Sequence, residues 1–143
     1  VIVRPGPHIN AEMTGFGYPE WILMDEEIQA KNPWGTTVLY PYATGPFPIP
    51  SYASDKLYEK TEIYFQKLKP ILQRHCGGSG CICLIQADNE TCNFFRDRPY
   101  IMDYSDCSKE QYRKFLAERY GTAAAMSERY HRNYSGFQET AFP

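Results

Sequence analysis

Two groups of acid and amide side chains have the composition needed for acid–base chemistry. The groups are Asn10 and Glu12, which follow the β-branched residues 1–3, and Asp88, Asn89 and Glu90, which follow the apolar residues 81–85. A pair of carboxyl groups can act as proton donor and as nucleophile or base, if burial or a nearby negative charge raises the pKa of the donor. Glu90 meets that requirement, because it follows an apolar segment and stands close to Asp88 in the sequence.

The order of elements predicts how the two groups come together. Residues 1–3 and 81–85 are typical of strands, and between them Ser54 caps a helix expected over residues 55–74, with a kink at Pro70. Strand, helix, strand is the βαβ pattern of a parallel sheet, in which the carboxyl ends of the strands meet at one edge. We therefore predict an α/β fold in which residues 81–85 form a buried strand and both polar groups lie at the same edge.

The remaining segments carry fewer signals. Five prolines in residues 32–52 predict a long loop rich in proline and tyrosine. Ser108 and Gln111 form a capping box that predicts the start of a helix, which Gly121 ends. Thr122 is then expected to cap a second, shorter helix.

Composition narrows the class of protein. The chain has 143 residues, of which 43% are hydrophobic and 15% aromatic, so it can build a core. The net charge of −2 argues against a nucleic-acid partner, and no apolar run approaches the length of a membrane span. The chain starts on Val1 rather than Met, and we expect it to be a piece of a longer protein. The odd number of cysteines, five, leaves the compartment open: secreted or lysosomal if eukaryotic, otherwise cytoplasmic.

Two stretches resemble the signature segments of glycoside hydrolase family 35 β-galactosidases. Residues 4–12 and 15–22 are similar to that family's R-P-G-P-Y-I-N/C-A-E stretch and to the glycine-rich segment ending in P-x-W that follows it. Residues 86–90 resemble its Q-x-E-N-E segment. His8 stands where the family usually has Tyr, and Asp88 where it has Glu. These departures bear on the expected sugar specificity more than on the chemistry.

The resemblance implies part of a (β/α)8 TIM barrel, about strands 3 to 4 with the helices that follow, incomplete within residues 1–143. It implies a retaining hydrolase of terminal β-galactosides in which Glu90 is the general acid/base and Asn89 binds the hydroxyl next to the anomeric carbon. Asn10, the Ala11 amide and Glu12 would bind other hydroxyls. The implied partners are a β-galactoside and the remainder of the barrel, with no metal or other cofactor.

Residues 112–122 are instead similar to the F-x-x-W-L-x-x-K-Y-G-T stretch of glycoside hydrolase family 42. A divergent member of the clan that both families share would combine these features. The resemblance places the nucleophile on a later strand, and Glu110, Glu118 and Glu128 follow helical patterns typical of solvated charges. We therefore expect the nucleophile to lie outside this chain, and the segment alone to be inactive.

Two other classes of protein remain open. A barrel homologue without catalysis would keep the sugar contacts only. A zinc-stabilised module would use His75 and Cys76, the Cys81-x-Cys83 pair, and Cys92 or Cys107, although the tight spacing of that pair does not match the usual zinc knuckle.

Overall fold

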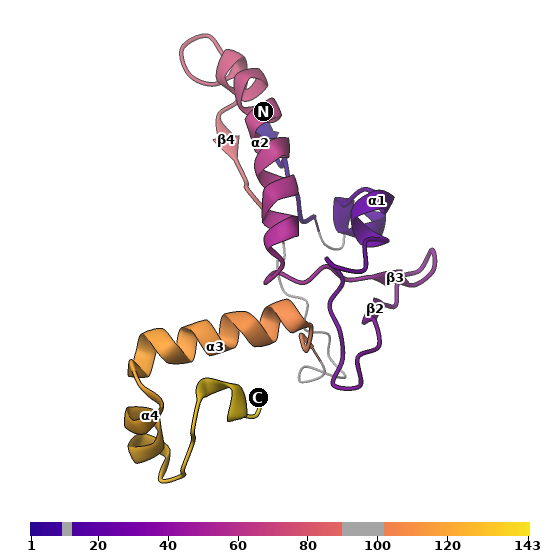
Figure 1. Ribbon diagram of the computed structural model, residues 1–143. Coiled ribbons are helices and arrows are strands. Elements are labelled where there is room, and N and C mark those ends of the chain that lie inside the picture. The colour runs from indigo at the N-terminus through magenta and orange to yellow at the C-terminus, as the bar shows by residue number, and fades with distance from the viewer. Residues whose placement is uncertain (10–12, 90–101) are drawn as a thin grey trace.

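The computed structural model describes residues 1–9, 13–89 and 102–143, and a parallel βαβ unit forms one end of it (Figure 1). Strand β1 (Ile2–Val3) pairs in parallel with β4 (Leu84–Ile85), and helix α2 (Asp55–His75) connects them. In the register of this pair, Ile2 lies opposite Leu84 and Val3 opposite Ile85. The predicted α/β pattern with parallel strands is confirmed.

Helix α2 begins and ends where its local sequence predicts. The Ser54 hydroxyl accepts a hydrogen bond from the Leu57 amide at 3.3 Å, which satisfies one of the amides left unpaired at a helix start. His75 is the last residue, where a basic side chain is favoured by the helix dipole, and α2 continues as one helix past Pro70. None of the helices in the described ranges is both long and apolar enough to cross a membrane.

The prediction that residues 81–85 form a buried strand is wrong for this chain. The side chains of Leu84 and Ile85 are 56% and 43% exposed. Among the described residues the sheet has two strands, and only α2 lies along it, so most of the strand surface has no layer against it. The apolar side chains along α2 are partly covered: Leu57 is buried and Leu68 and Leu72 are half-buried, whereas Tyr64 and Ile71 are exposed.

The main hydrophobic core lies in the long segment between β1 and α2. Its elements are the 3-10 helix η1 (Thr14–Gly17), helix α1 (Glu20–Leu23), and the antiparallel strands β2 (Leu39–Tyr40) and β3 (Phe47–Pro48). The core residues are Phe16, Tyr18, Ile22, Leu23, Ile28, Ala30, Val38, Phe47, Ile49 and Leu57. The predicted absence of long regular structure in residues 32–52 is confirmed, because this segment contributes only the two short strands.

Two helices and a returning tail complete the described chain. Helix α3 (Asp106–Tyr120) is followed by α4 (Ala123–Tyr130) and the 3-10 helix η2 (Phe137–Glu139). Gly121 ends α3 and Thr122 caps α4, as predicted. The predicted start of α3 at Ser108 is wrong, because Ser105 is the cap and its hydroxyl accepts from the Ser108 amide at 3.3 Å.

Candidate functional site

The two strand ends that carry the predicted polar groups run side by side. Beyond β1 and β4, an isolated parallel bridge joins Ile9 to Asn89, and the Asn89 amide donates to the His8 carbonyl at 3.0 Å. The first segment takes seven residue steps from Ile2 to Ile9, whereas the second takes five from Leu84 to Asn89. The segment around Pro5 and Pro7 absorbs this difference, since proline cannot donate to a sheet ladder. The expected meeting of the two strand ends is therefore confirmed up to Ile9 and Asn89.

A chain of side-chain hydrogen bonds orients Asn89. The Arg4 guanidinium donates from Nε to Gln86 Oε1 at 3.2 Å, and Gln86 Nε2 donates to Asn89 Oδ1 at 3.0 Å. Because Oδ1 is the acceptor of this bond, the Nδ2 amide group is the donor end of the Asn89 side chain. Arg4 thus helps to orient Gln86, and through it Asn89.

Asp88 supports the first strand end from the second. Its Oδ1 accepts a hydrogen bond from the His8 backbone amide at 3.2 Å. The His8 backbone therefore bonds to Asp88 through its N–H and to Asn89 through its carbonyl. His8 is therefore hydrogen-bonded to two consecutive residues of the second strand end.

The His8 side chain is enclosed by aromatic rings. It is 1% exposed, and its ring centre lies 4.7 Å from that of Phe16, 6.0 Å from that of Tyr18 and 5.7 Å from that of Tyr52. The Tyr52 hydroxyl lies 2.5 Å from His8 Nδ1. Burial raises the pKa of the Tyr18 phenol well above its ordinary value, with smaller contributions from Tyr52 and Asp88, so this ring stays neutral.

The turn that places Phe16 under His8 depends on glycine. Gly15 and Phe16 both have positive φ, at 65° and 55°, and Phe16 is held there although a side chain disfavours this conformation. The positive φ of Gly15 favours glycine, and a Cβ there would lie 2.8 Å from Leu23 Cδ1, so the Leu23 side chain would have to shift. The glycine-rich segment thus allows the Phe16 ring to pack against the His8 ring.

Of the residues predicted for the site, only Asn89 lies within the described part of the chain. Glu90, Asn10, Ala11 and Glu12 lie outside it. Ile9 and Asn89, the last described residues before them, are paired with each other.

The helical glutamates are where the sequence places them. Glu110 and Glu118 lie in α3 and Glu128 in α4, and all three are exposed. None of the three stands on a strand, so they fit the predicted role of solvated charges. The nucleophile expected outside these 143 residues stays a prediction.

A second polar cluster, which no sequence pattern indicates, connects the segment after β1 to the start of α3. Asp103 Oδ1 accepts from the Lys31 amide at 3.1 Å and from the Ser105 amide at 2.9 Å. Asp103 Oδ2 accepts from the hydroxyls of Ser51 and Ser108. Ser51 stands 52 residues before Asp103, and neither periodicity nor local spacing indicates such a contact.

The cysteines do not assemble a metal site within the described ranges. Cys76, Cys81, Cys83 and Cys107 are free thiols, and residues 1–9, 13–89 and 102–143 hold no group of three or more His, Cys, Asp or Glu side chains arranged to bind a metal ion. Cys92 lies outside these ranges. The described residues therefore give the zinc-stabilised alternative no support.

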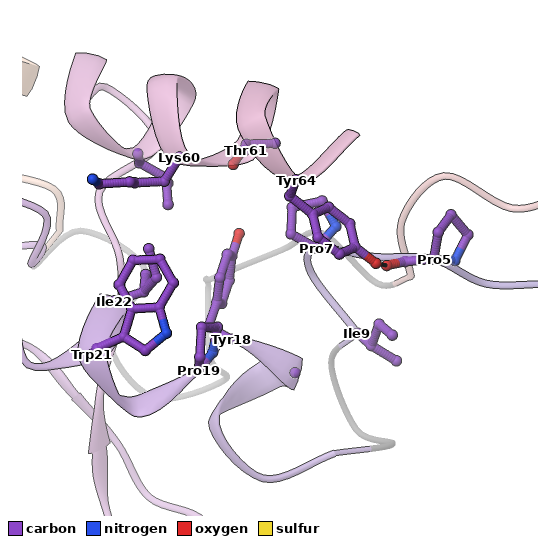
Figure 2. A pocket seen from close by; sticks show the side chains of 12 residues that line it. Pro5, Pro7, Ile9, Tyr18, Pro19, Trp21, Ile22, Lys60, Thr61 and Tyr64 are labelled. Carbon is purple, nitrogen blue, oxygen red and sulfur yellow. Dashed lines mark hydrogen bonds between the residues drawn. The ribbon is translucent and has the colours of Figure 1, made fainter. Parts of the chain in front are cut away.

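An apolar pocket of about 140 Å³ lies between the end of the β1 segment and α2 (Figure 2). Figure 2 shows Tyr18 and Trp21 on one side of it and Tyr64 on the other, where the Tyr64 hydroxyl donates to the Pro5 carbonyl at 2.6 Å. Lys60 is the charged side chain among its described lining residues. The lining residues that the structure describes include no carboxyl group.

The known proteins to which this chain is similar include enzymes named for reactions on sugars. No family model matches the chain. The chain is 30% identical to a β-1,2-glucosyltransferase from Ignavibacterium album and 28% identical to an exo-β-D-glucosaminidase from Pyrococcus horikoshii. These alignments cover all of this chain but only 19% and 18% of the relatives, so the chain spans about a fifth of their length.

Among solved structures, the chain is similar to a polyextremophilic β-galactosidase from the Antarctic haloarchaeon Halorubrum lacusprofundi, with a TM-score of 0.59 and 21% identity. The match covers 88% of this chain and 18% of that one. At this identity the likeness concerns the fold alone. The chain therefore has a mixed α/β fold of the glycosidase type, equivalent to part of that β-galactosidase.

Proposed function

We propose that this chain is part of the catalytic (β/α)8 barrel of a retaining glycoside hydrolase that removes terminal β-linked sugars, in the manner of family 35 and with family 42-like features after the acid/base. In this proposal Glu90 is the general acid/base, and the nucleophile comes from a later strand. The substrate is a carbohydrate, and the remainder of the barrel completes the site.

The parallel pairing of Ile9 with Asn89 is the observation that carries the proposal. In a barrel of this kind catalytic groups stand at the carboxyl ends of neighbouring parallel strands. The pairing aligns the two segments at the last described residues before Asn10 and Glu90. Both polar groups of the sequence therefore follow directly from one edge of a parallel sheet.

The contacts of Asn89 support its proposed role. Its Oδ1 accepts from Gln86, so the amide nitrogen is the end of the side chain that would donate to a sugar hydroxyl in this proposal. A contact to the hydroxyl beside the anomeric carbon strengthens as the oxocarbenium-like transition state forms. Asn10, the Ala11 amide and Glu12 would bind the remaining hydroxyls of the same sugar.

The first candidate for the sugar is a terminal β-galactoside, which the family 35-like sequence motifs favour. A second candidate is a terminal β-linked glucosamine or glucose unit. The names of the two relatives favour it, since one is an exo-β-D-glucosaminidase and the other a β-1,2-glucosyltransferase. A panel of aryl β-glycosides assayed on the full-length protein separates the candidates.

Replacement of Glu90 by Gln in the full-length protein tests the mechanism. Loss of the proton donor should lower kcat/KM about 10²- to 10⁴-fold for an aryl glycoside with a poor leaving group. The loss should be much smaller for a dinitrophenyl glycoside, whose leaving group needs no proton. Glu118→Gln, an exposed change on α3, is the matched control and should leave both rates unchanged.

Three results would contradict parts of the proposal. Equal activity of the Glu90→Gln variant and the wild type would remove Glu90 as acid/base. An α-configured first product, seen by proton NMR during turnover, would exclude a retaining mechanism. Sugar binding without any turnover by the wild type would favour the non-catalytic homologue instead.

A further inference from the structure

The backbone of His8, in the first strand end, is hydrogen-bonded to two consecutive residues of the second strand end. Its N–H donates to Asp88 Oδ1 at 3.2 Å, and its carbonyl accepts from the Asn89 amide at 3.0 Å. The next residue along each segment completes the bridge between Ile9 and Asn89. A displacement of the His8 backbone would therefore move the first strand end relative to the second.

The side chain of His8 is held from a distant part of the chain. The Tyr52 hydroxyl lies 2.5 Å from His8 Nδ1, although the two residues are separated by 44 positions. A buried imidazole nitrogen that lost its partner would carry a desolvation cost, so this bond favours one orientation of the ring. Phe16 and Tyr18 pack on the same ring and leave it little room to turn.

Tyr52 itself is fixed by its neighbours. The Ser51 amide donates to the Ile28 carbonyl at 2.6 Å, and the Ser51 hydroxyl bonds to Asp103. Ser54, two residues after Tyr52, caps α2. The backbone on both sides of Tyr52 is thus anchored, so its phenol is presented to His8 from a rigid segment.

We propose that Tyr52 is a positioning residue, which acts through His8 to keep the two strand ends in the arrangement that the reaction needs. This inference rests on the proposed function. Among the described residues, the contact of the Tyr52 hydroxyl that bears on the strand ends is the one to His8 Nδ1. Tyr52 is 37% exposed, and a change to Phe keeps its ring, so the substitution removes one hydrogen bond to His8 and little packing.

Replacement of Tyr52 by Phe in the full-length protein removes the hydroxyl and keeps the ring. Because misplacement of reacting groups by about 1 Å can cost about a hundredfold in rate, we expect kcat to fall about ten- to a hundredfold. KM should stay within about twofold, and Tm should fall modestly because the buried His8 Nδ1 loses its hydrogen-bond partner. Tyr58→Phe is the matched control, since Tyr58 lies on the first turns of α2 with 62% of its side chain exposed.

A double variant tests whether Tyr52 acts through His8. If it does, Tyr52→Phe should add no further loss of kcat in a His8→Phe background, because the two changes remove the same contact. NMR of imidazole nitrogens supplies a readout that does not depend on turnover. The His8 Nδ1 resonance should shift in Tyr52→Phe and stay in place in Tyr58→Phe.

The outcomes separate this inference from the proposed function. An unchanged kcat in Tyr52→Phe, in a protein that Glu90→Gln inactivates, overturns the positioning role alone. Additive losses in the double variant, or an unshifted His8 resonance, overturn it as well. Full activity of Glu90→Gln overturns the proposed function first, and the positioning role falls with it.

Discussion

Replacement of Asp103 should weaken the hydrogen-bonded contact between the segment after β1 and the start of α3. The carboxylate accepts four hydrogen bonds, two from backbone amides and two from serine hydroxyls. These two kinds of donor respond differently to a change of acceptor. A hydroxyl can turn and accept a hydrogen bond instead, whereas a backbone N–H can only donate.

The magnitudes follow from that difference. Asp103→Ala leaves the Lys31 and Ser105 amides without their acceptor, and a hydrogen bond to a charged group contributes about 1.5–3 kcal/mol. We take the lower value for each amide because the site is only partly buried, which gives about 3 kcal/mol. Asp103→Asn keeps one oxygen for the two amides, and its NH2 group can donate to the serine hydroxyls. It should cost only about 1 kcal/mol.

Hydrogen exchange of single amides in the full-length protein measures this loss of local stability. Since about 1.4 kcal/mol corresponds to a factor of ten, exchange of the Lys31 and Ser105 amides should quicken about a hundredfold in Asp103→Ala and less than tenfold in Asp103→Asn. Asp106→Ala is the control, because that carboxylate is exposed and bonds only to Lys109 among the described contacts. Equal exchange in the Ala and Asn variants, or none above wild type in the Ala variant, would refute the reasoning.

Two further predictions concern the ion pair between Asp25 and Lys56 and the burial of Met126. The Lys56 ammonium lies 2.7 Å from Asp25 and its hydrogen bond holds the pKa of that carboxyl below its ordinary value, so the stabilising contact is present above the unfolded-state pKa and is lost as pH falls through the folded-state pKa. Lys56→Met should return the Asp25 titration seen by NMR toward its ordinary value, and an unmoved curve would contradict this. Met126, on α4, is fully buried, so Met126→Ala should lower the free energy of unfolding by about 2–5 kcal/mol in urea titrations. Met24 is exposed, and Met24→Ala should change this free energy by less than about 0.5 kcal/mol.

Features set by neighbouring residues could be predicted from the sequence. Ser54 and Thr122 cap helices because a hydroxyl accepts from an amide three residues on, and that relation is visible in the sequence. The start of α3 was placed three residues late, at Ser108. Ser105 is 5% exposed and lies beside Ser51 and Asp103, and these tertiary contacts favour it as the cap.

Contacts between distant segments could not be predicted in the same way. The alternation of side chains in a strand says nothing about which tyrosine, 44 residues away, meets His8. The prediction of a buried strand at residues 81–85 failed for a related reason. An apolar run indicates that a strand can be buried, but burial requires a layer on each face, and α2 supplies only one among the described residues.

The four residues from Ser51 to Ser54 join the parts of the molecule that the proposed reaction needs. Ser51 bonds to Asp103 before α3, Tyr52 bonds to His8 at the strand ends, and Ser54 caps α2. Each bond reaches a different part of the chain, yet the three residues that make these bonds lie within four positions of one another. A shift at any one of them is therefore transmitted to the other two through a backbone that has little freedom. This geometry explains why a loop rich in proline, with only two short strands, can still hold the two strand ends in register.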